Sequence, residues 1–545
     1  MEQHLLFGSE NAEADQLLFD CKIDKTKPSE AKQIITGRWG TGKTAIIFLQ
    51  NEKLINELNN INPEYKNIWY LSEGRLNFKK ITEIYYESQN QNYYFESLMA
   101  EFWKIEIIRI YCLLLYILRD KFQHFHGAHW NRVFHLAKTR NLRKSVSEYM
   151  TPLVNILHPT KNVYSDINEI TIQLSELVDN ETYRSVKKCL QDLKNNGEEV
   201  PTVAIEPIET PVSSIEHSET GLASKVVTSL LNIFKDEFEP GKTPFNLRLV
   251  IPWHRFPNTE TAFPQKIDQY VGKVSWTRNT LREFICKRIA WEFRRVGRNY
   301  SLKGGQDEWD ILFEKQVENI SFNPPIIENS FDYLLRHTHY RNREIQSIAR
   351  KCIEDIFDED NGLDFQNEDE FLRKGKITSY DIKRTIHKHN ESYANLLIEE
   401  AARRFPEINQ IINSLNKIEM PFSMNDLSRR INKNDLNISL DNIVDILWDS
   451  GVLGITAIVK NNLDSKKLDE LFSKKGKYDF RDKKGHLHER WTWFFYNIDF
   501  TSPNSIINRL ERIENDIEYG FVLHPKTFEK FSPKMKTENN APVGI

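Results

Sequence analysis

Short apolar runs alternate with longer amphipathic stretches over the first half of the chain. Apolar, β-branched residues at 33–36 are followed by a glycine-rich turn and a buried helix start at 44–49. Further strands are predicted at 67–71, 203–205 and 247–251. Strands that alternate with helices are typical of a mainly parallel α/β sheet with helices on both faces. The pattern therefore predicts an α/β fold for this part of the chain.

Helical periodicity dominates most of the remaining sequence. Residues 95–193 predict an all-helical insertion with few glycines, and a further helix is predicted at 221–238. Residues 331–405 again have a helical pattern and predict a helical lid. Two short amphipathic helices within 424–453 precede a Lys-rich charged turn and an aromatic strand at 490–496. Two helices followed by a strand pair are the outline of a winged-helix module.

The composition is that of a globular protein with several domains. The chain has 545 residues, of which 39% are hydrophobic and 28% charged, close to globular averages but too long for one compact core. A formal net charge of -4 excludes a uniformly basic nucleic-acid coat and leaves a local basic face open. Five scattered cysteines without a CxxC pair argue against a disulfide framework or a zinc ribbon and favour a reducing, cytoplasmic compartment.

Nothing in the sequence directs the chain to a membrane. The N-terminus lacks the cationic start and apolar run of a signal peptide. The most apolar stretch, 110–118, is far shorter than the roughly 20 residues that a membrane span requires. We therefore expect a cytoplasmic protein without a membrane partner, and we expect 110–118 to lie in a buried helix.

One motif carries a specific chemistry. It satisfies the pattern G-x-x-x-x-G-K-[ST] and reads Gly37-Arg38-Trp39-Gly40-Thr41-Gly42-Lys43-Thr44. The glycines let consecutive backbone N–H groups face a phosphate, Lys43 places an ammonium against the β and γ phosphates, and Thr44 offers a hydroxyl to Mg²⁺. Flanked by a predicted strand and helix, the motif predicts binding of a nucleoside triphosphate, with ATP and Mg²⁺ as the expected ligands.

A hydrolytic phosphate-loop enzyme also needs an apolar strand that ends in an acid. The best candidate runs from Thr202 to Glu209. Glu206 takes the magnesium role in this interpretation, and Glu209 orients the attacking water. The alternative is a pair of solvated acids in a Pro- and Thr-rich loop, because an aspartate is the usual first acid.

Other polar residues are candidates for contact with the γ-phosphate. The predicted strand 247–251 leads to His254 and Arg255, either of which senses the nucleotide or merely closes a turn. Arg341 and Arg343 stand at the start of a predicted helix. Arginine suits a developing phosphate charge because its donors fork and it stays ionised. These two arginines reach the nucleotide from a lid or a neighbouring subunit, or they belong to a solvated helix end.

The chain resembles a family of bacterial P-loop ATPases, related to the AAA-like and STAND groups, that carry a C-terminal winged helix. The matching elements are Phe7–Asp15, the loop Gly37–Ala45, Tyr340–Glu344, Leu447–Gly454 and Phe521–Pro525. The resemblance implies an ATP-driven switch, and similar proteins are suspected of antiviral defence. It carries over Lys43 and Thr44 as nucleotide ligands and Arg341 and Arg343 as lid arginines. Glu206 departs from the aspartate of the common pattern, which bears on the rate of hydrolysis.

The motifs and the resemblance together predict an order of domains. The predicted segments are an N-terminal part of a P-loop ATPase core at 1–94, a helical insertion at 95–195, the C-terminal part of the core at 196–325, a helical lid at 326–410, a winged-helix-like domain at 411–500 and a C-terminal segment at 501–545.

Three functions remain open on the sequence. The first is an ATPase switch, in which a lid closes over ATP and hydrolysis reopens it. The second is a nucleotide-gated scaffold that restrains or recruits a protein effector without useful turnover. The third is a DNA-binding regulator, suggested by the Lys-rich stretch 466–484. An arginine contributed in trans would also make a homo-oligomer plausible.

Overall fold

The fold is known from a computed structural model. It describes residues 5–9, 15, 17–18, 20–21, 32–38, 40–72, 92–139, 178–206, 220–253, 267–319, 326–357, 367–402, 405, 407–432, 438–459, 490–494, 503–504, 507–508 and 517–535. The chain forms two compact units, one of Lys27–Val274 and the other of Met1–Thr26 together with Ser275–Ile545. The chain passes between the units at 26/27, inside the predicted segment 1–94, and at 274/275, inside the predicted segment 196–325. The predicted order of domains stays a prediction.

The unit Lys27–Val274 is an α/β fold built on a five-stranded, all-parallel sheet. The strands are β1 (Ile34–Gly37), β2 (Tyr70–Ser72), β3 (Thr202–Glu206), β4 (Asn246–Pro252) and β5 (Val271–Val274), in the order β2-β3-β4-β1-β5. The predicted parallel sheet is confirmed. The strand β5 has no counterpart in the prediction, because its four residues contain a glycine and a lysine and form no apolar run.

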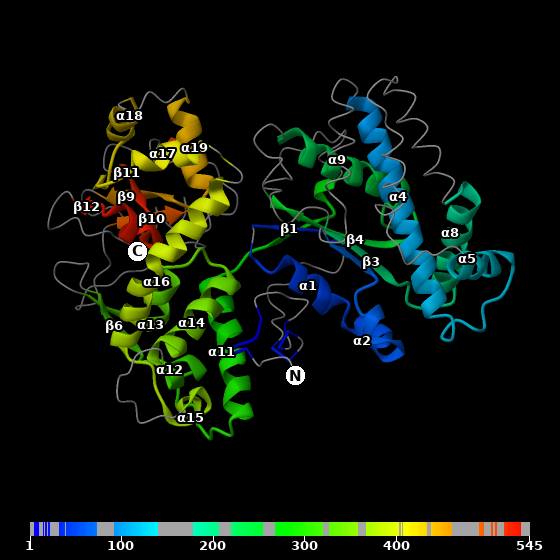
Figure 1. The fold of residues 1–545 in the computed structure, drawn as a ribbon, viewed down its shortest axis with the longest axis horizontal. Helices are drawn as coiled ribbons and strands as arrows, with labels where there is room; N and C mark the ends of the chain where they lie inside the picture. Colours follow the sequence, from blue (N-terminus) through cyan, green and yellow to red (C-terminus); the bar gives the residue numbers. More distant parts are fainter. Residues whose placement is uncertain are drawn as a thin grey trace. The chain divides into compact units, whose positions relative to one another are not determined.

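Helices cover both faces of this sheet. The helices of this unit are α1 (Lys43–Gln50), α2 (Glu52–Ile61), the 3₁₀ helix η2 (Pro63–Tyr65), α4 (Asn92–Ile117), α5 (Ala128–Thr139), α8 (Asn180–Asn195) and α9 (Thr220–Glu237). Figure 1 shows α4 and α9 on one side of the sheet and α1 and α2 on the other. The described parts of 95–193 are largely helical, as their periodicity predicts, whereas residues 140–177 lie outside the described part of the chain. That this range is an insertion stays a prediction.

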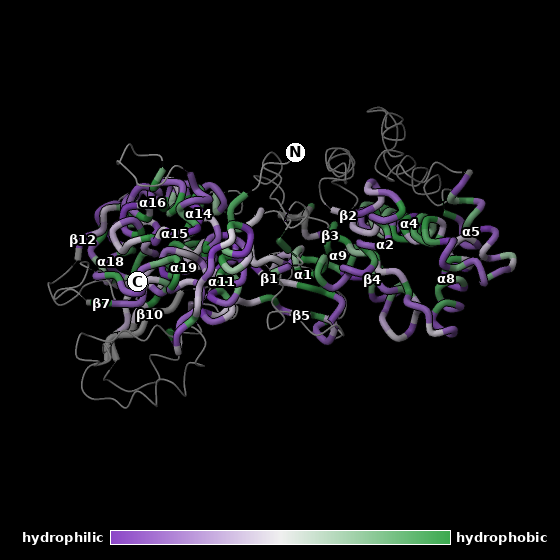
Figure 2. The backbone as a smooth tube through the Cα atoms, turned by 90° about the horizontal axis from the view of Figure 1, so that it is seen from below, coloured by the Kyte–Doolittle hydropathy of each residue, from purple (hydrophilic) through white to green (hydrophobic). Residues whose placement is uncertain are grey.

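Burial in this unit follows from the two covered faces. Every residue of β1 and β3 is buried, as expected for parallel strands that have no solvent-exposed face. Figure 2 shows hydrophobic residues concentrated in α4 and α9. The apolar stretch 110–118 lies largely in α4, as predicted, with Tyr111 and Leu114 fully buried. None of the helices in the described residues has the length and apolarity needed to cross a membrane.

The other unit begins with a helical part. Its elements are α11 (Arg278–Arg295), α12 (Glu308–Leu312), β6 (Gln316–Asn319), β7 (Ile326–Asn329), α13 (Ser330–Leu335), α14 (Asn342–Phe357), α15 (Glu368–Lys374) and α16 (Ser379–Ala402). The helical pattern of 331–405 is confirmed in its described residues. Strands β6 and β7 form an antiparallel hairpin. Trp309 stacks on Phe313 with ring centroids 3.8 Å apart in the core of this part.

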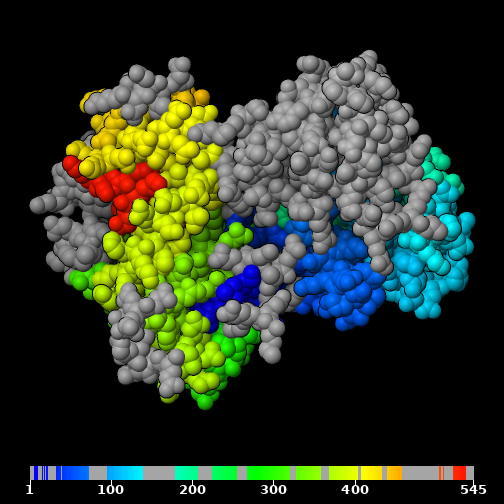
Figure 3. Space-filling model, viewed as in Figure 1, coloured from blue at the N-terminus to red at the C-terminus, as the bar shows by residue number. Residues whose placement is uncertain are grey.

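The N-terminal residues pack against the same helices, although the residues in contact are 285 to 342 positions apart in sequence. Phe7 is fully buried, and its N–H donates to Glu292 Oε1 at 2.9 Å. Arg350 and Gln346 of α14 both donate to the carbonyl oxygen of Gly8, at 2.7 and 2.6 Å. Figure 3 shows this N-terminal segment, in dark blue, lying against the green helices of its own unit. It therefore acts as part of this helical core.

The C-terminal part of this unit combines short helices with a small sheet. Its elements are α17 (Ile408–Asn413), β8 (Glu419–Met420), α18 (Met424–Asn432), α19 (Leu440–Asp449), β9 (Leu453–Val459), β10 (Arg490–Phe494), β11 (Ile517–Leu523), the 3₁₀ helix η6 (Pro525–Thr527), α22 (Phe528–Phe531) and β12 (Lys534–Met535). Strands β10, β9 and β11 form an antiparallel sheet in that order. The two predicted helices within 424–453 are confirmed. The Lys-rich turn predicted at 466–484 lies outside the described residues.

Candidate nucleotide site

The predicted phosphate loop connects β1 to α1. Strand β1 ends at Gly37, and α1 begins at Lys43. Gly40 and Gly42 have φ angles of 71° and 78°, in the left-handed region that glycine enters without the steric cost of a Cβ atom. These two residues turn the chain sharply between strand and helix. Trp39, which the motif also includes, lies outside the described residues.

The start of α1 suits an anion. Gly42 precedes the helix and provides no side-chain cap, and the first turn contains no acidic residue. The first N–H groups of a helix have no partner within the helix, and the helix dipole places partial positive charge there. Such an end is a ready site for phosphate. The loop therefore places two glycines with left-handed backbone directly before α1. The partial positive charge at the start of that helix is not neutralised by an acidic side chain in its first turn.

Lys43 lies inside the loop. Its side chain is 3% exposed, and its Nζ donates a hydrogen bond of 3.1 Å to the carbonyl oxygen of Arg38. Thr41 Oγ1 donates to the same carbonyl at 2.7 Å. The ammonium is thus held within the turn that the motif predicts to surround a phosphate.

Glu206 comes from the end of β3 and meets the loop directly. Its side chain is fully buried, and Thr44 Oγ1 donates to Glu206 Oε2 at 2.9 Å. The hydroxyl of Tyr70, on β2, donates to the same oxygen. Burying a carboxylate is costly unless hydrogen bonds compensate for the lost water. The two hydroxyls supply such bonds, and they link β2, β3 and the first turn of α1.

The parallel register explains why these residues meet. Gly37 pairs with Pro252 in β4, and Ser72 pairs with Glu206, so the carboxyl ends of four strands lie at one edge of the sheet. Open parallel sheets bind their ligands outside this edge. The sequence prediction that places Glu206 at the end of a strand is therefore consistent with the observed register.

The oxygen donors at this edge fit Mg²⁺. Thr44 offers a hydroxyl and Glu206 a carboxylate, and Mg²⁺ prefers oxygen ligands, taking one or two from the protein and the rest from water and phosphate. No group of three or more His, Cys, Asp and Glu side chains suited to a metal occurs in the described residues. The donor set therefore fits a metal that arrives with a phosphate better than a closed protein cage.

Several predicted site residues lie outside the described part of the chain. They are Trp39, Glu209, His254 and Arg255. Strand β4 can be followed to Pro252, and the ring of Trp253 beyond it lies 4.8 Å from Lys273 Nζ. The roles predicted for Glu209, His254 and Arg255 therefore stay predictions.

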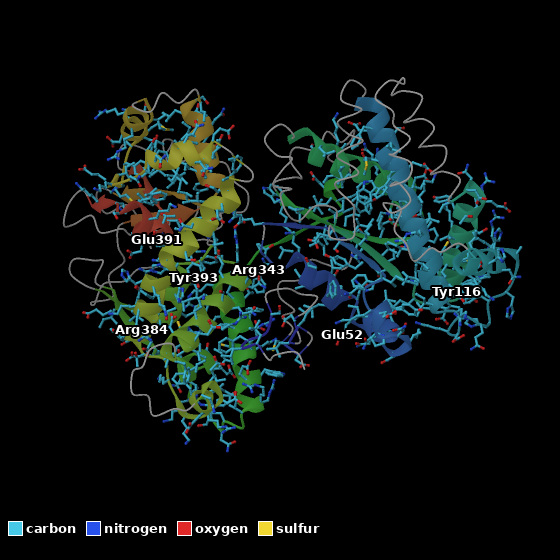
Figure 4. All side chains as sticks on the ribbon, viewed as in Figure 1. Glu52, Tyr116, Arg343, Arg384, Glu391 and Tyr393 are labelled. Carbon is cyan, nitrogen blue, oxygen red and sulfur yellow. The ribbon has the colours of Figure 1, made fainter. Side chains whose placement is uncertain are left out.

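Arg341 and Arg343 belong to the helical part of the other unit. Arg341 NH1 lies 3.1 Å from Glu400 and 3.8 Å from Glu344. Burial would lower the pKa of the Arg341 guanidinium, but Glu400 and Glu344 outweigh it and raise that pKa above its ordinary value. Figure 4 shows Arg343 at the start of α14. It is half-buried.

Tyr70 is the site residue that sequence reasoning missed. The predicted strand 67–71 includes it, but an aromatic residue in a buried strand is usually a packing residue. Only the neighbouring position of β2 and β3 shows that its hydroxyl reaches Glu206.

Comparison of the chain with protein-family models, curated proteins and solved structures gives no match.

Proposed function

We propose that the protein binds a nucleoside triphosphate, ATP with Mg²⁺, through Gly37–Thr44 and Glu206. The observation that carries the proposal is the hydrogen bond of 2.9 Å from Thr44 Oγ1 to Glu206 Oε2. It joins the loop to an acid 162 residues further along the chain. A chance occurrence of the loop motif would not require a buried carboxylate at this position.

Each residue of the site has a role in this proposal. Backbone N–H groups of the loop and of the first turn of α1 bind the phosphates. Lys43 exchanges its bond to Arg38 O for the β and γ phosphate oxygens. Because Thr44 directs its proton to Glu206, its oxygen lone pairs are left for the metal. Mg²⁺, when bound, would neutralise charge on the phosphate oxygens.

We further propose that ATP is hydrolysed and that the cycle operates a switch. Glu209 orients the attacking water in this scheme, as the sequence predicts. The resemblance to AAA-like and STAND-related ATPases supports a sensor role in antiviral defence, with the helical part as lid and the C-terminal part as a winged helix that transmits the nucleotide state. The α18–α19 pair followed by antiparallel strands supports that module.

Nucleotide binding and turnover test the proposal together. ATP and GTP titrations, followed by phosphate release with Mg²⁺, compare the wild type with Lys43→Ala and Glu209→Gln. We expect Lys43→Ala to abolish binding and Glu209→Gln to bind normally but turn over slowly. Lys53→Ala is the matched control, because this lysine of the same unit is 67% exposed. Normal binding by Lys43→Ala would exclude the loop as the site.

A nucleotide-gated scaffold is the second candidate. One observation favours it: Arg341, a predicted lid arginine, is already paired with Glu400 and Glu344 within its own unit. An arginine held in this way is not free to stabilise a developing phosphate charge without breaking those pairs. Nucleotide binding without multiple-turnover phosphate release would support the scaffold, whereas steady turnover would exclude it.

A further inference from the structure

Tyr70 occupies a defined place beside the candidate nucleotide site. It lies on β2, which pairs with β3 in parallel register, with Tyr70 opposite Ala204. Its side chain is 2% exposed. The ring packs edge-on against Phe48 of α1, with centroids 5.2 Å apart. The ring is therefore fixed between the sheet and the helix that begins at the phosphate loop.

The hydroxyl of Tyr70 shares its acceptor with Thr44. Both groups donate to Glu206 Oε2, Tyr70 from β2 and Thr44 from α1. A hydroxyl has one proton and two lone pairs. Since each proton points to Glu206, the remaining lone pairs of Thr44 are directed away from this carboxylate.

Glu206 needs such an anchor more than an aspartate would. A glutamate side chain has one more rotatable bond than aspartate, and rotamer freedom must be lost when the carboxylate is fixed. The hydrogen bond from Thr44 restrains one oxygen of this carboxylate. A second donor to the same oxygen, on a ring that is itself packed against Phe48, restrains it further.

We infer that Tyr70 is a positioning residue of the nucleotide site: its hydroxyl fixes Glu206 Oε2, and Glu206 in turn orients the Thr44 hydroxyl so that its lone pairs face Mg²⁺. This inference rests on the proposed function. It assigns Tyr70 to the metal-dependent part of nucleotide binding and not to the phosphate contacts of the loop. A merely structural tyrosine would affect both parts alike.

Tyr70→Phe tests this division because it removes one oxygen and keeps the packed ring. Calorimetric titration with ATP is performed in Mg²⁺ and again in EDTA. We expect the affinity in EDTA to be unchanged and the gain in affinity on adding Mg²⁺ to fall about tenfold, as for the loss of one hydrogen bond to a charged group. Thermal unfolding of the ligand-free variant provides a readout that does not depend on the nucleotide.

Tyr111→Phe is the matched control. Tyr111 is fully buried in the same unit, and its hydroxyl accepts a hydrogen bond of 2.9 Å from the N–H of Asn246, at the opposite end of β4 from Pro252. Its loss should lower the unfolding temperature and leave the Mg²⁺-dependent gain unchanged. The control thus separates loss of a buried hydroxyl from loss of this particular hydroxyl.

A second test uses the double variant Tyr70→Phe/Glu206→Gln. It still distinguishes the outcomes if Tyr70→Phe alone is too unstable to titrate. An uncharged Gln at this position has less need of a second donor. If Tyr70 acts through Glu206, adding Tyr70→Phe to Glu206→Gln should cause no further loss of the Mg²⁺-dependent gain. A further loss of the same size as in the wild-type background would overturn the inference.

The remaining outcomes are distinct. A Tyr70→Phe variant that binds like the wild type in Mg²⁺, or that loses affinity equally in Mg²⁺ and EDTA, would overturn the inference while the proposed function stands. If the wild type and Lys43→Ala are equally unable to bind nucleotide, the proposed function fails and the inference fails with it.

Discussion

Gly37 ends β1 at a position where a side chain has no room. A Cβ atom on Gly37 would lie 2.8 Å from Thr41 Oγ1 and 3.1 Å from the carbonyl oxygen of Val274. Neither neighbour moves easily, because Thr41 is bonded to Arg38 O and Val274 is paired with Gly37 in the sheet. Here the loop requires glycine for space, whereas Gly40 and Gly42 provide the left-handed backbone.

Gly37→Ala should therefore destabilise the unit that contains the sheet. We expect a loss of about 1–3 kcal/mol in the free energy of unfolding, typical of overpacking, together with weaker ATP binding because Thr41 must move. Denaturant unfolding and nucleotide titration measure the two effects. Gly304→Ala is the control, since nothing lies within 4 Å of a Cβ atom there. Equal effects of both substitutions would contradict the crowding argument.

At the level of secondary-structure elements, a buried cluster of charged side chains connects α14 to η6 within one unit. Glu344 lies 2.8 Å from Lys526 Nζ and 3.8 Å from Arg341 NH1. Burial would raise the pKa of the Glu344 carboxyl, but Lys526, His339 and Arg341 together hold it well below its ordinary value. Figure 4 shows Tyr393 on α16, and its ring lies 5.3 Å from Lys526 Nζ. The helical and C-terminal parts are therefore joined by buried ion pairs, in which each charge compensates for the burial of the other.

His524 sits in this cluster as a neutral imidazole. It is fully buried and stacks on His339 with ring centroids 4.3 Å apart. Its Nδ1 accepts from the N–H of Lys526, which leaves Nε2 to donate to Thr338 O at 3.2 Å. Burial, with the neighbouring His339 and Lys526, holds the pKa of His524 well below its ordinary value of 6.5.

The low pKa of His524 predicts acid sensitivity. Below pH 6.5 the unfolded chain gains a proton at His524 that the folded chain does not, so stability is lost as the pH falls. One such group contributes about 1.4 kcal/mol per pH unit. His524→Asn, which keeps an acceptor for Lys526, should reduce this slope in denaturant unfolding between pH 7 and pH 5. His387→Gln, at a side chain 76% exposed, should not. Parallel slopes for wild type and His524→Asn would refute this assignment.

For the whole molecule, the division into two units has a consequence for the N-terminus. Phe7 is fully buried in the unit of the C-terminal half, where its backbone bonds to Glu292 and Arg288. The phosphate loop follows it by only 30 residues in sequence, yet belongs to the other unit. A substitution at Phe7 should therefore destabilise helices that lie nearly 300 residues away in sequence, beginning with α11.

Phe7→Ala should weaken the helical part of its unit by about 3–5 kcal/mol, the usual range for a buried phenylalanine. Hydrogen exchange of the full chain is the measurement. We expect faster exchange in α11 and α14 and unchanged exchange in β3 and β4. Leu5→Ala is the control, since Leu5 is 42% exposed. Faster exchange confined to the sheet would show that the N-terminal segment stabilises the other unit instead.

Much of the local structure could be predicted because its signals are local. The phosphate-loop strand and helix, β3, β4 and the helices within 95–193 and 331–405 follow from apolar runs and helical periodicity. The strand β5 and the hairpin of β6 and β7 could not, because their sequences, VGKV, QVEN and IIEN, contain glycine or polar residues and form no apolar run. The order of the strands also depends on long-range pairing that no single segment encodes.

By itself, the sequence determined which functional groups the candidate site contains. They are a glycine-rich loop with Lys43 and Thr44, and an apolar strand that ends in Glu206. Periodicity and motif spacing are properties of residues close together in sequence, so they can be recognised without knowledge of the fold. Only the tertiary structure decided that Thr44, Glu206 and Tyr70 meet at one oxygen atom. It also decided that Phe7 belongs with α11 and α14, because such contacts depend on which strands and helices pack together across hundreds of residues.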